Sequence, residues 1–212
     1  MSNPQTLVLL IPVILFALSV HEYSHGMIAY KLGDPTAYYA GRLTLNPISH
    51  LDPMGTIMLF LVHFGWAKPV PVDPRYFRNP KRDMLWVALA GPIANMIVAF
   101  FSGLVIRLIN LNPGLVHSSP VGTAFYLMMV LSLQINLALA IFNMLPIPPL
   151  DGSKVLFGLL PREYEYIAYN LERYGPPVLF GLILLGMFTG ISIFWAFIGP
   201  FVGFFSTLFA GG

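Results

Sequence analysis

The chain of 212 residues contains no cysteine, and charged residues make up only 9% of it, against 57% hydrophobic residues. The missing cysteines exclude disulfides and thiolate metal sites, so a bound metal would need histidine and carboxylate ligands, which suit zinc. Soluble domains average about 25% charged residues, so most of the surface here is expected to face lipid. The net charge of +2, from few and dispersed basic residues, argues against nucleic-acid binding.

Hydrophobic residues gather in stretches at positions 7–30, 54–64, 84–109, 121–145 and 178–209. The stretch at 54–64 is too short for a bilayer core, which needs about 20 residues, and is expected to be re-entrant. Residues 1–6 contain no Lys or Arg, so the first stretch is read as a retained helix and not a signal peptide. The last stretch is expected to form either one long kinked helix or a span followed by an interfacial piece. The pattern predicts an all-α polytopic membrane protein, with about 4–6 transmembrane helices in a single domain over residues 1–212.

Basic residues are unevenly distributed among the loops. The loop at 110–120 has none, and Arg107 alone departs from the pattern. The loops on the other side hold Lys31, Arg42, Lys68, Arg75, Arg78, Lys81, Arg82, Lys154, Arg162 and Arg173. Because cytoplasmic loops are enriched in Lys and Arg, these loops are expected to be cytoplasmic and the N-terminus to lie outside.

The strongest motif is His21-Glu22-Tyr23-Ser24-His25, an HExxH within the first hydrophobic stretch. Residues four apart share a helix face, so both imidazoles could bind one zinc ion while Glu22 accepts a proton from the attacking water. Ionisable residues within a membrane segment are costly and usually mark function. A chance match or a satisfied polar cluster is the alternative interpretation.

The third zinc ligand is expected from the sequence Asn143-Met-Leu-Pro-Ile-Pro-Pro-Leu-Asp151-Gly152. Its prolines should end the fourth helix and leave an extended backbone, from which Asp151 emerges at a turn. The positive-inside pattern places this segment and HExxH near the same cytoplasmic depth, so the two can meet. Asp151 could also cap a following helix, a role that does not exclude metal binding.

The paired HExxH and N-x-x-P-x-P-x-x-D-G motifs resemble the site-2 protease family of intramembrane metalloproteases. The sequence Gly91-Pro92-Ile93-Ala94-Asn95 is similar to a further short motif of that family. The resemblance covers roughly residues 7–152, which would form the catalytic core, with a C-terminal helical region at 153–212. It is to the short type, without PDZ or CBS domains. It implies a multi-pass protein of the cell (inner) membrane that cuts transmembrane protein substrates within the lipid bilayer.

The resemblance also implies roles for individual residues. His21, His25 and Asp151 would bind one zinc ion, and Glu22 would be the general base. Asn143, and less strongly Asn95, are candidates for orienting the substrate backbone or stabilising an oxyanion. Either asparagine could instead join helices by hydrogen bonds.

The segment Gly65-Trp66-Ala67-Lys68-Pro69-Val70-Pro71-Val72 alternates apolar residues with prolines, which indicates an extended edge strand. The resemblance implies a membrane-associated hairpin here that pairs with an unwound substrate through residues such as Trp66 and Pro69. An ordinary proline-rich loop is the alternative. Nearby, His50 and Asp52 could suggest a second metal site, but a local structural role is favoured.

Other functions fit the sequence less well. A prenyl-protein endopeptidase would need a glutamate as third ligand, and the candidates Glu163, Glu165 and Glu172 lie in a charged segment. A transporter would show paired halves, and no such symmetry is found. A non-proteolytic homologue that binds metal or membrane segments would not need the base Glu22.

Overall fold

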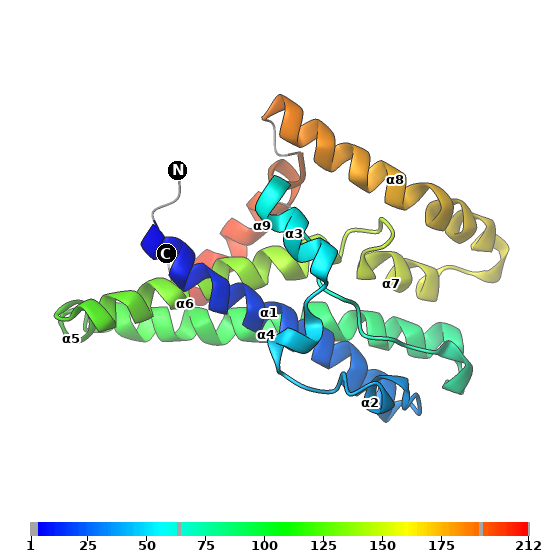
Figure 1. The fold of residues 1–212 in the computed structure, drawn as a ribbon, viewed down its shortest axis with the longest axis horizontal. Helices are drawn as coiled ribbons and strands as arrows, with labels where there is room; N and C mark the ends of the chain where they lie inside the picture. The colour runs from blue at the N-terminus through cyan, green and yellow to red at the C-terminus, as the bar shows by residue number, and fades with distance from the viewer. Residues whose placement is uncertain (1–3, 63–64, 191–192, 212) are drawn as a thin grey trace.

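The computed structural model describes residues 4–62, 65–190 and 193–211, and these are dominated by helices (Figure 1). In chain order the elements are α1 (Pro4–Lys31), α2 (Thr36–Tyr39), η1 (Pro47–His50), α3 (Pro53–Val62), η2 (Pro74–Tyr76), α4 (Pro80–Leu111), α5 (Gly114–His117), α6 (Pro120–Asn143), α7 (Asp151–Leu159), η3 (Arg162–Tyr164), α8 (Glu165–Thr189) and α9 (Ile193–Ala210). Within the described residues, α1, α4, α6 and α9 are the 4 helices long and apolar enough to cross a membrane. The prediction of an all-α polytopic membrane protein is confirmed.

Helix α4 occupies the centre of the bundle and packs against α1, α6, α7 and α9. Figure 1 shows α1 and α6 running in one direction and α4 in the other. The α4–α6 contact is built around the fully buried Ala99 and Leu137. A small residue facing a large one lets the two helices approach closely, as is common in membranes.

The region between α1 and α4 begins and ends at the same end of the bundle (Figure 1). Helix α3 has only 10 residues, too few to span, so this region fits the predicted re-entrant element. Residues 65–72, here called the strap, do not form the predicted regular strand. They join the rest of the chain through an isolated antiparallel bridge between Leu51 and Ala67. Pro69 and Pro71 lack backbone N–H donors, so a longer ladder cannot form there.

The loop after α6 also differs from the prediction of an extended backbone. Helix α6 does end at Asn143, before the prolines. The loop then closes two tight turns, in which Leu145 N–H donates to Phe142 O at 3.1 Å and Leu150 N–H donates to Ile147 O at 3.0 Å. Prolines exclude the helix but not these local bonds. The loop delivers Asp151 as the first residue of α7.

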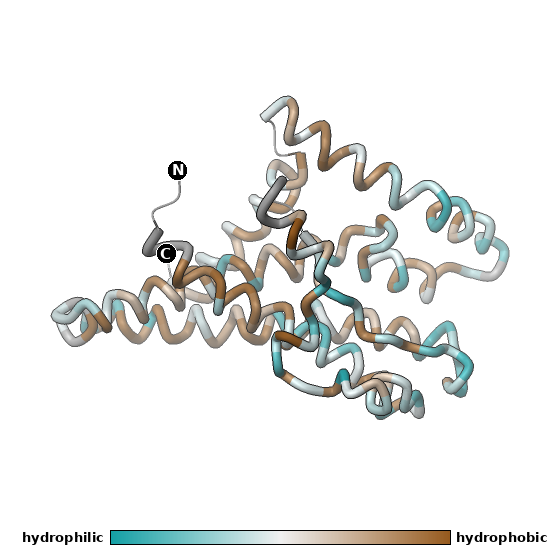
Figure 2. Tube along the Cα trace, in the orientation of Figure 1, coloured by the Kyte–Doolittle hydropathy of each residue, from teal (hydrophilic) through white to brown (hydrophobic). Residues whose placement is uncertain are grey.

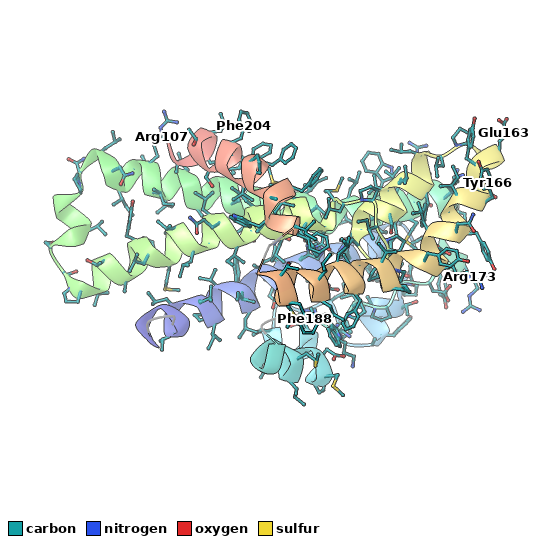
Figure 3. The ribbon with its side chains drawn as sticks, turned by 90° about the horizontal axis from the view of Figure 1, so that it is seen from above. Arg107, Glu163, Tyr166, Arg173, Phe188 and Phe204 are labelled. Carbon is teal, nitrogen blue, oxygen red and sulfur yellow. The ribbon has the colours of Figure 1, made fainter. Side chains whose placement is uncertain are left out.

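The last hydrophobic stretch contributes to two helices, α8 and α9, so of the two predicted alternatives the single kinked helix is wrong. Gly190 ends α8 in the left-handed conformation, with φ of 70°, which favours glycine. Figure 2 shows hydrophilic residues gathered at one end of the molecule, around the starts of α4 and α8. In Figure 3 the labelled Glu163, Tyr166 and Arg173 lie at that end, and Arg107 lies towards the other.

Candidate metal centre and active site

The HExxH helix and the start of α7 bring three side chains together. His21 Nε2 lies 3.0 Å from Asp151 Oδ2, His25 Nε2 lies 3.1 Å from the same oxygen, and the two Nε2 atoms are 3.0 Å apart. The three residues are only 5%, 8% and 7% exposed. Among the described residues they are the one group of His, Cys, Asp or Glu placed to hold a metal ion.

The hydrogen bonds on the far side of each ring decide which nitrogen carries the proton. His21 Nδ1 lies 2.6 Å from Asn95 Oδ1, and His25 Nδ1 lies 2.7 Å from the carbonyl oxygen of Val87. Both partners accept only, so each neutral ring donates from Nδ1 and keeps a lone pair on Nε2. This is the arrangement that metal-binding histidines use.

Two imidazole lone pairs and a carboxylate oxygen therefore face one another with no proton between them. Such a cluster is repulsive unless a cation lies among its members. The ligands of a tetrahedral zinc ion stand about 3.3 Å apart, close to the separations of 3.0 and 3.1 Å found here. The residues present therefore fit a zinc ion.

Asp151 supplies the negative charge of the cluster. An aspartate carboxyl group is ordinarily ionised at neutral pH. Lys154 on the next helical turn lies 3.9 Å from its other oxygen.

Asn95 is fully buried and all its polar atoms are engaged. Its Oδ1 accepts from His21, and its Nδ2 donates to Ala17 O at 3.1 Å and to Asn136 Oδ1 at 2.7 Å. Asn136 in turn donates to Ser132 O at 2.8 Å. This favours the helix-joining alternative for Asn95 over substrate contact, and it adds an orienting role towards His21.

Gly91 explains how α4 comes so close to the histidines. A Cβ at this position would stand 2.4 Å from His25 Nε2 and 2.6 Å from His21 Nε2, closer than real Cβ atoms approach. The motif at residues 91–95 thus contributes in two ways. Gly91 leaves room for the two imidazoles, and Asn95 accepts a hydrogen bond from His21.

Glu22 is half-buried and contacts the strap. Its Oε2 accepts a hydrogen bond from the backbone N–H of Val70 at 2.8 Å. This bond fixes the carboxylate through Oε2, and Oε1 makes no hydrogen bond among the described residues. Sequence reasoning missed Val70, because a backbone donor leaves no signal in the side-chain pattern.

An apolar cavity of about 490 Å³ lies between α1, α3, α6 and α9. Its α1 wall includes Leu15 and Leu18, and Glu22 follows Leu18 by four residues on the same helix face. Trp66 of the strap and Leu139 of α6 also line it. The cavity therefore lies along the face of α1 that also carries Glu22.

The other predicted site residues are not members of the His21-His25-Asp151 cluster. Asn143 donates to Leu139 O in its own helix at 3.0 Å. Pro69 is exposed in the strap beside the cavity-lining Trp66. His50 is buried and its Nε2 bonds to Thr44 O at 2.7 Å, while Asp52 accepts from Gly55 N–H at the start of α3, so both have the expected structural roles. Among the other histidines, His63 lies outside the described residues.

The glutamates that a prenyl-protein endopeptidase would need are exposed. Glu163, Glu165 and Glu172 all face outward, and Glu165 pairs with Lys81 at 3.4 Å. The structure thus offers Asp151, not a glutamate, to the two histidines.

A buried His-His-Asp cluster beside a glutamate, set within membrane-crossing helices, defines the class of intramembrane metallohydrolases. Comparison with known proteins gives the family. Residues 113–186, which include Asp151, match the model of Peptidase family M50. The chain is 38% identical over 186 residues to a Bacillus subtilis protein named "Putative zinc metalloprotease YwhC", covering 88% of this chain and 84% of that one.

Other relatives have the same kind of name. The Rip2 protein of Mycobacterium tuberculosis is 28% identical over 195 residues, covering 86% of this chain and 70% of that protein. The MJ0611 protein of Methanocaldococcus jannaschii is 43% identical over 140 residues, covering 64% of this chain and 62% of that protein. No solved structure shows significant similarity. This chain belongs to peptidase family M50, the site-2 protease family, and is an intramembrane zinc metalloprotease.

Proposed function

We propose that this protease hydrolyses a peptide bond within or next to a transmembrane segment of another membrane protein, with His21, His25 and Asp151 holding zinc and Glu22 as general base. One observation carries the assignment of residues. Two imidazole lone pairs and a carboxylate from distant parts of the chain converge within 3.0–3.1 Å of each other. A shared cation makes that arrangement favourable.

A bound zinc ion would supply a Lewis acid that polarises the scissile carbonyl and lowers the pKa of water at the site. Glu22 follows His21 directly in the helix and is held by Val70 N–H through Oε2. Its Oε1 is then positioned to take the proton from the attacking water and to return it to the leaving amine. The bond from Asn95 keeps His21 in the tautomer that offers Nε2.

The apolar cavity supports a transmembrane substrate. A substrate helix has apolar side chains, and the cavity is lined by residues such as Leu15, Leu139 and Ile198. The peptide bond must leave its helix before it can react, and the strap offers backbone groups to an unwound chain. We therefore assign Trp66 and Pro69 to substrate binding. Asn143 could orient the substrate backbone or stabilise an oxyanion only if its amide releases Leu139 O when substrate binds.

We also propose that the site lies towards the cytoplasmic side of the membrane. The hydrophilic end of the molecule holds most of the basic residues and lies beside the C-terminal end of α1 (Figure 2). Cytoplasmic loops are enriched in such residues, so we expect the N-terminus to lie outside. Residues 7–152 would then form the catalytic core and residues 153–212 a helical region packed on it.

Cleavage of a model transmembrane peptide by the purified protein tests this function. The wild-type protein should cleave the peptide, and Glu22→Gln, which keeps the shape and loses the base, should be at least about 100-fold slower. Glu163→Gln, an exposed glutamate remote from the cluster, is the matched control and should retain wild-type activity. Equal cleavage by wild type and Glu22→Gln would contradict the proposal.

A further inference from the structure

The strap is fastened to the rest of the protein along one side of its backbone. Lys68 N–H donates to His50 O at 2.9 Å, and Val70 N–H donates to Glu22 Oε2 at 2.8 Å. Between these bonds, the carbonyl oxygen of Lys68 accepts from Arg42 Nη2 at 2.7 Å. Alternate residues of an extended chain direct their backbone groups to opposite sides, so Ala67 and Pro69 present theirs to the other side.

Arg42 reaches this position because of the turn that ends α2. Gly41 has a φ of 65°, its N–H donates to Tyr38 O, and Arg42 N–H donates to Ala37 O. These two bonds around a left-handed glycine form a Schellman motif, which turns the chain and directs Arg42 inward. The sequence Gly41-Arg42 thus encodes an inward-facing arginine.

The environment of Arg42 is unusual for a charged residue. The side chain is only 8% exposed, and no ion pair to it is found among the residues described by the structure. A guanidinium is always charged and its burial is costly unless hydrogen bonds compensate the lost hydration. The Lys68 carbonyl is the partner that the structure provides.

The hydrogen bond from Arg42 to Lys68 O affects the position of Val70, whose N–H binds the general base Glu22. The Lys68 carbonyl belongs to the peptide bond that leads into Pro69, whose ring fixes φ. Val70 follows, so once the Lys68 carbonyl is held, the direction of the Val70 N–H depends mainly on the single angle ψ of Pro69. Gly26, beside His25, makes room for this approach, since a Cβ there would stand 2.7 Å from Leu43 Cδ2 and 3.0 Å from Val70 Cγ1.

We propose that Arg42 is a positioning residue for catalysis, which holds the strap in register so that Val70 N–H binds and orients Glu22. The inference rests on the role of Glu22 as general base given above. Within the part of the chain that the structure describes, Arg42 makes no hydrogen bond or ion pair to His21, His25 or Asp151. It acts through the Lys68 carbonyl, and it also sets which edge of the strap stays open to an unwound substrate.

Hydrogen–deuterium exchange of the zinc-loaded full-length protein in nanodiscs tests whether the Arg42–Lys68 hydrogen bond holds the strap, without relying on activity. In Arg42→Gln, the amides of residues 65–72 should exchange about tenfold faster than in wild type, as expected for loss of a hydrogen bond from a charged donor. Peptides from α4 should be unchanged. Arg78→Gln removes an exposed arginine from the same connecting region and should behave as wild type.

Arg42→Lys separates positioning from folding. This change keeps the positive charge but replaces the planar guanidinium with a compact ammonium group. The strap amides should therefore exchange at a rate between those of wild type and Arg42→Gln. If Arg42→Gln does not fold, Arg42→Lys alone decides, and it must exchange faster than wild type. Wild-type exchange over residues 65–72 in the folded variants would overturn the proposal.

Kinetics add a readout that a purely structural role would not move. Arg42→Gln should keep wild-type zinc content while kcat for the transmembrane peptide falls about tenfold, with partial rescue in Arg42→Lys. Loss of zinc together with activity, or unchanged kcat, would refute positioning. If wild type and Glu22→Gln cleave the peptide equally, the proposed function fails, and the exchange experiment still decides whether Arg42 holds the strap.

Discussion

At the scale of single residues, the site depends on the side chain of Asn95 and on the lack of a side chain at Gly91. Gly91 leaves the space in which both imidazoles lie, and Asn95, one helical turn later, fixes the tautomer of His21. Both are on α4, so that helix serves as the back wall of the metal cluster. A mutation in either residue should act on the metal and not only on stability.

The change Gly91→Ala should abolish most activity. The added Cβ would stand 2.4 Å from His25 Nε2, and the imidazole cannot yield freely because its Nδ1 is bonded to Val87 O. Overpacking of this kind costs about 1–3 kcal/mol, here directed at the ligand geometry. Zinc content and peptide cleavage should both fall at least about tenfold. Gly181→Ala, where a Cβ meets nothing within 4 Å, is the control, and normal zinc binding by Gly91→Ala would count against this geometry.

The change Asn95→Ala should weaken zinc affinity by about 10–100-fold, the usual effect of losing an outer partner of a metal-binding histidine. It also leaves the buried Asn136 amide oxygen without its donor. Competition with a zinc chelator measures the affinity. The exposed Asn170→Ala is the matched control, and equal affinities in the two variants would show that the bond to His21 does not matter for the metal.

At the scale of elements, the site is a junction of α1, α4 and α7, with the strap alongside. The short loop after α6 brings the Asp151 carboxylate to the histidines of α1, and its turns are tightly packed. A Cβ on Gly152 would stand 2.2 Å from the carbonyl oxygen of Met144. Helix α8 covers this loop, with Leu179 packed against Leu145 and Leu150.

We therefore expect Gly152→Ala to displace α7 and with it the Asp151 carboxylate. Activity should fall by about 100-fold or more, with zinc content clearly reduced. The replacement Gly203→Ala, in α9 where a Cβ meets nothing within 4 Å, should be silent. Full activity of Gly152→Ala at wild-type zinc content would mean that the loop has more freedom than the structure gives it.

The element scale also shows what the sequence could predict. HExxH and Asp151 were both found from motifs, because residue types and helical spacing carry that information. The helix-joining bonds of Asn95 were among the predicted alternatives, but its bond to His21, the use of Val70 N–H and the tight turns before Asp151 were not predicted. They depend on backbone groups and on the packing of α4 against α1, which no local pattern encodes. A break in the last hydrophobic stretch was one of two predicted alternatives, but its position at Gly190 was not predicted because the hydrophobic run continues through it.

At the scale of the whole molecule, the orientation in the membrane decides where substrates are cut and released. The chain has no cysteine, so single introduced cysteines report topology without background. Arg78→Cys lies in the connection before α4, and Ser118→Cys lies in the connection between α4 and α6; both positions are exposed. From the positive-inside rule we expect the first position to lie in the cytoplasm and the second outside.

A membrane-impermeant maleimide should therefore label Ser118→Cys in intact cells and label Arg78→Cys only after the membrane is opened. Both variants should react fully in detergent, which controls for buried thiols. Labelling of Arg78→Cys in intact cells, with Ser118→Cys protected, would reverse the orientation and place the site near the outer face.

The most direct test of the shared metal centre is zinc stoichiometry in the purified protein and its variants. The wild-type protein and Glu22→Gln should each carry about one zinc ion per chain, because the base is not a ligand. His21→Ala and Asp151→Ala should each carry far less, although these residues are 130 positions apart. Retention of a full zinc ion by Asp151→Ala, folded and in the membrane, would contradict the account.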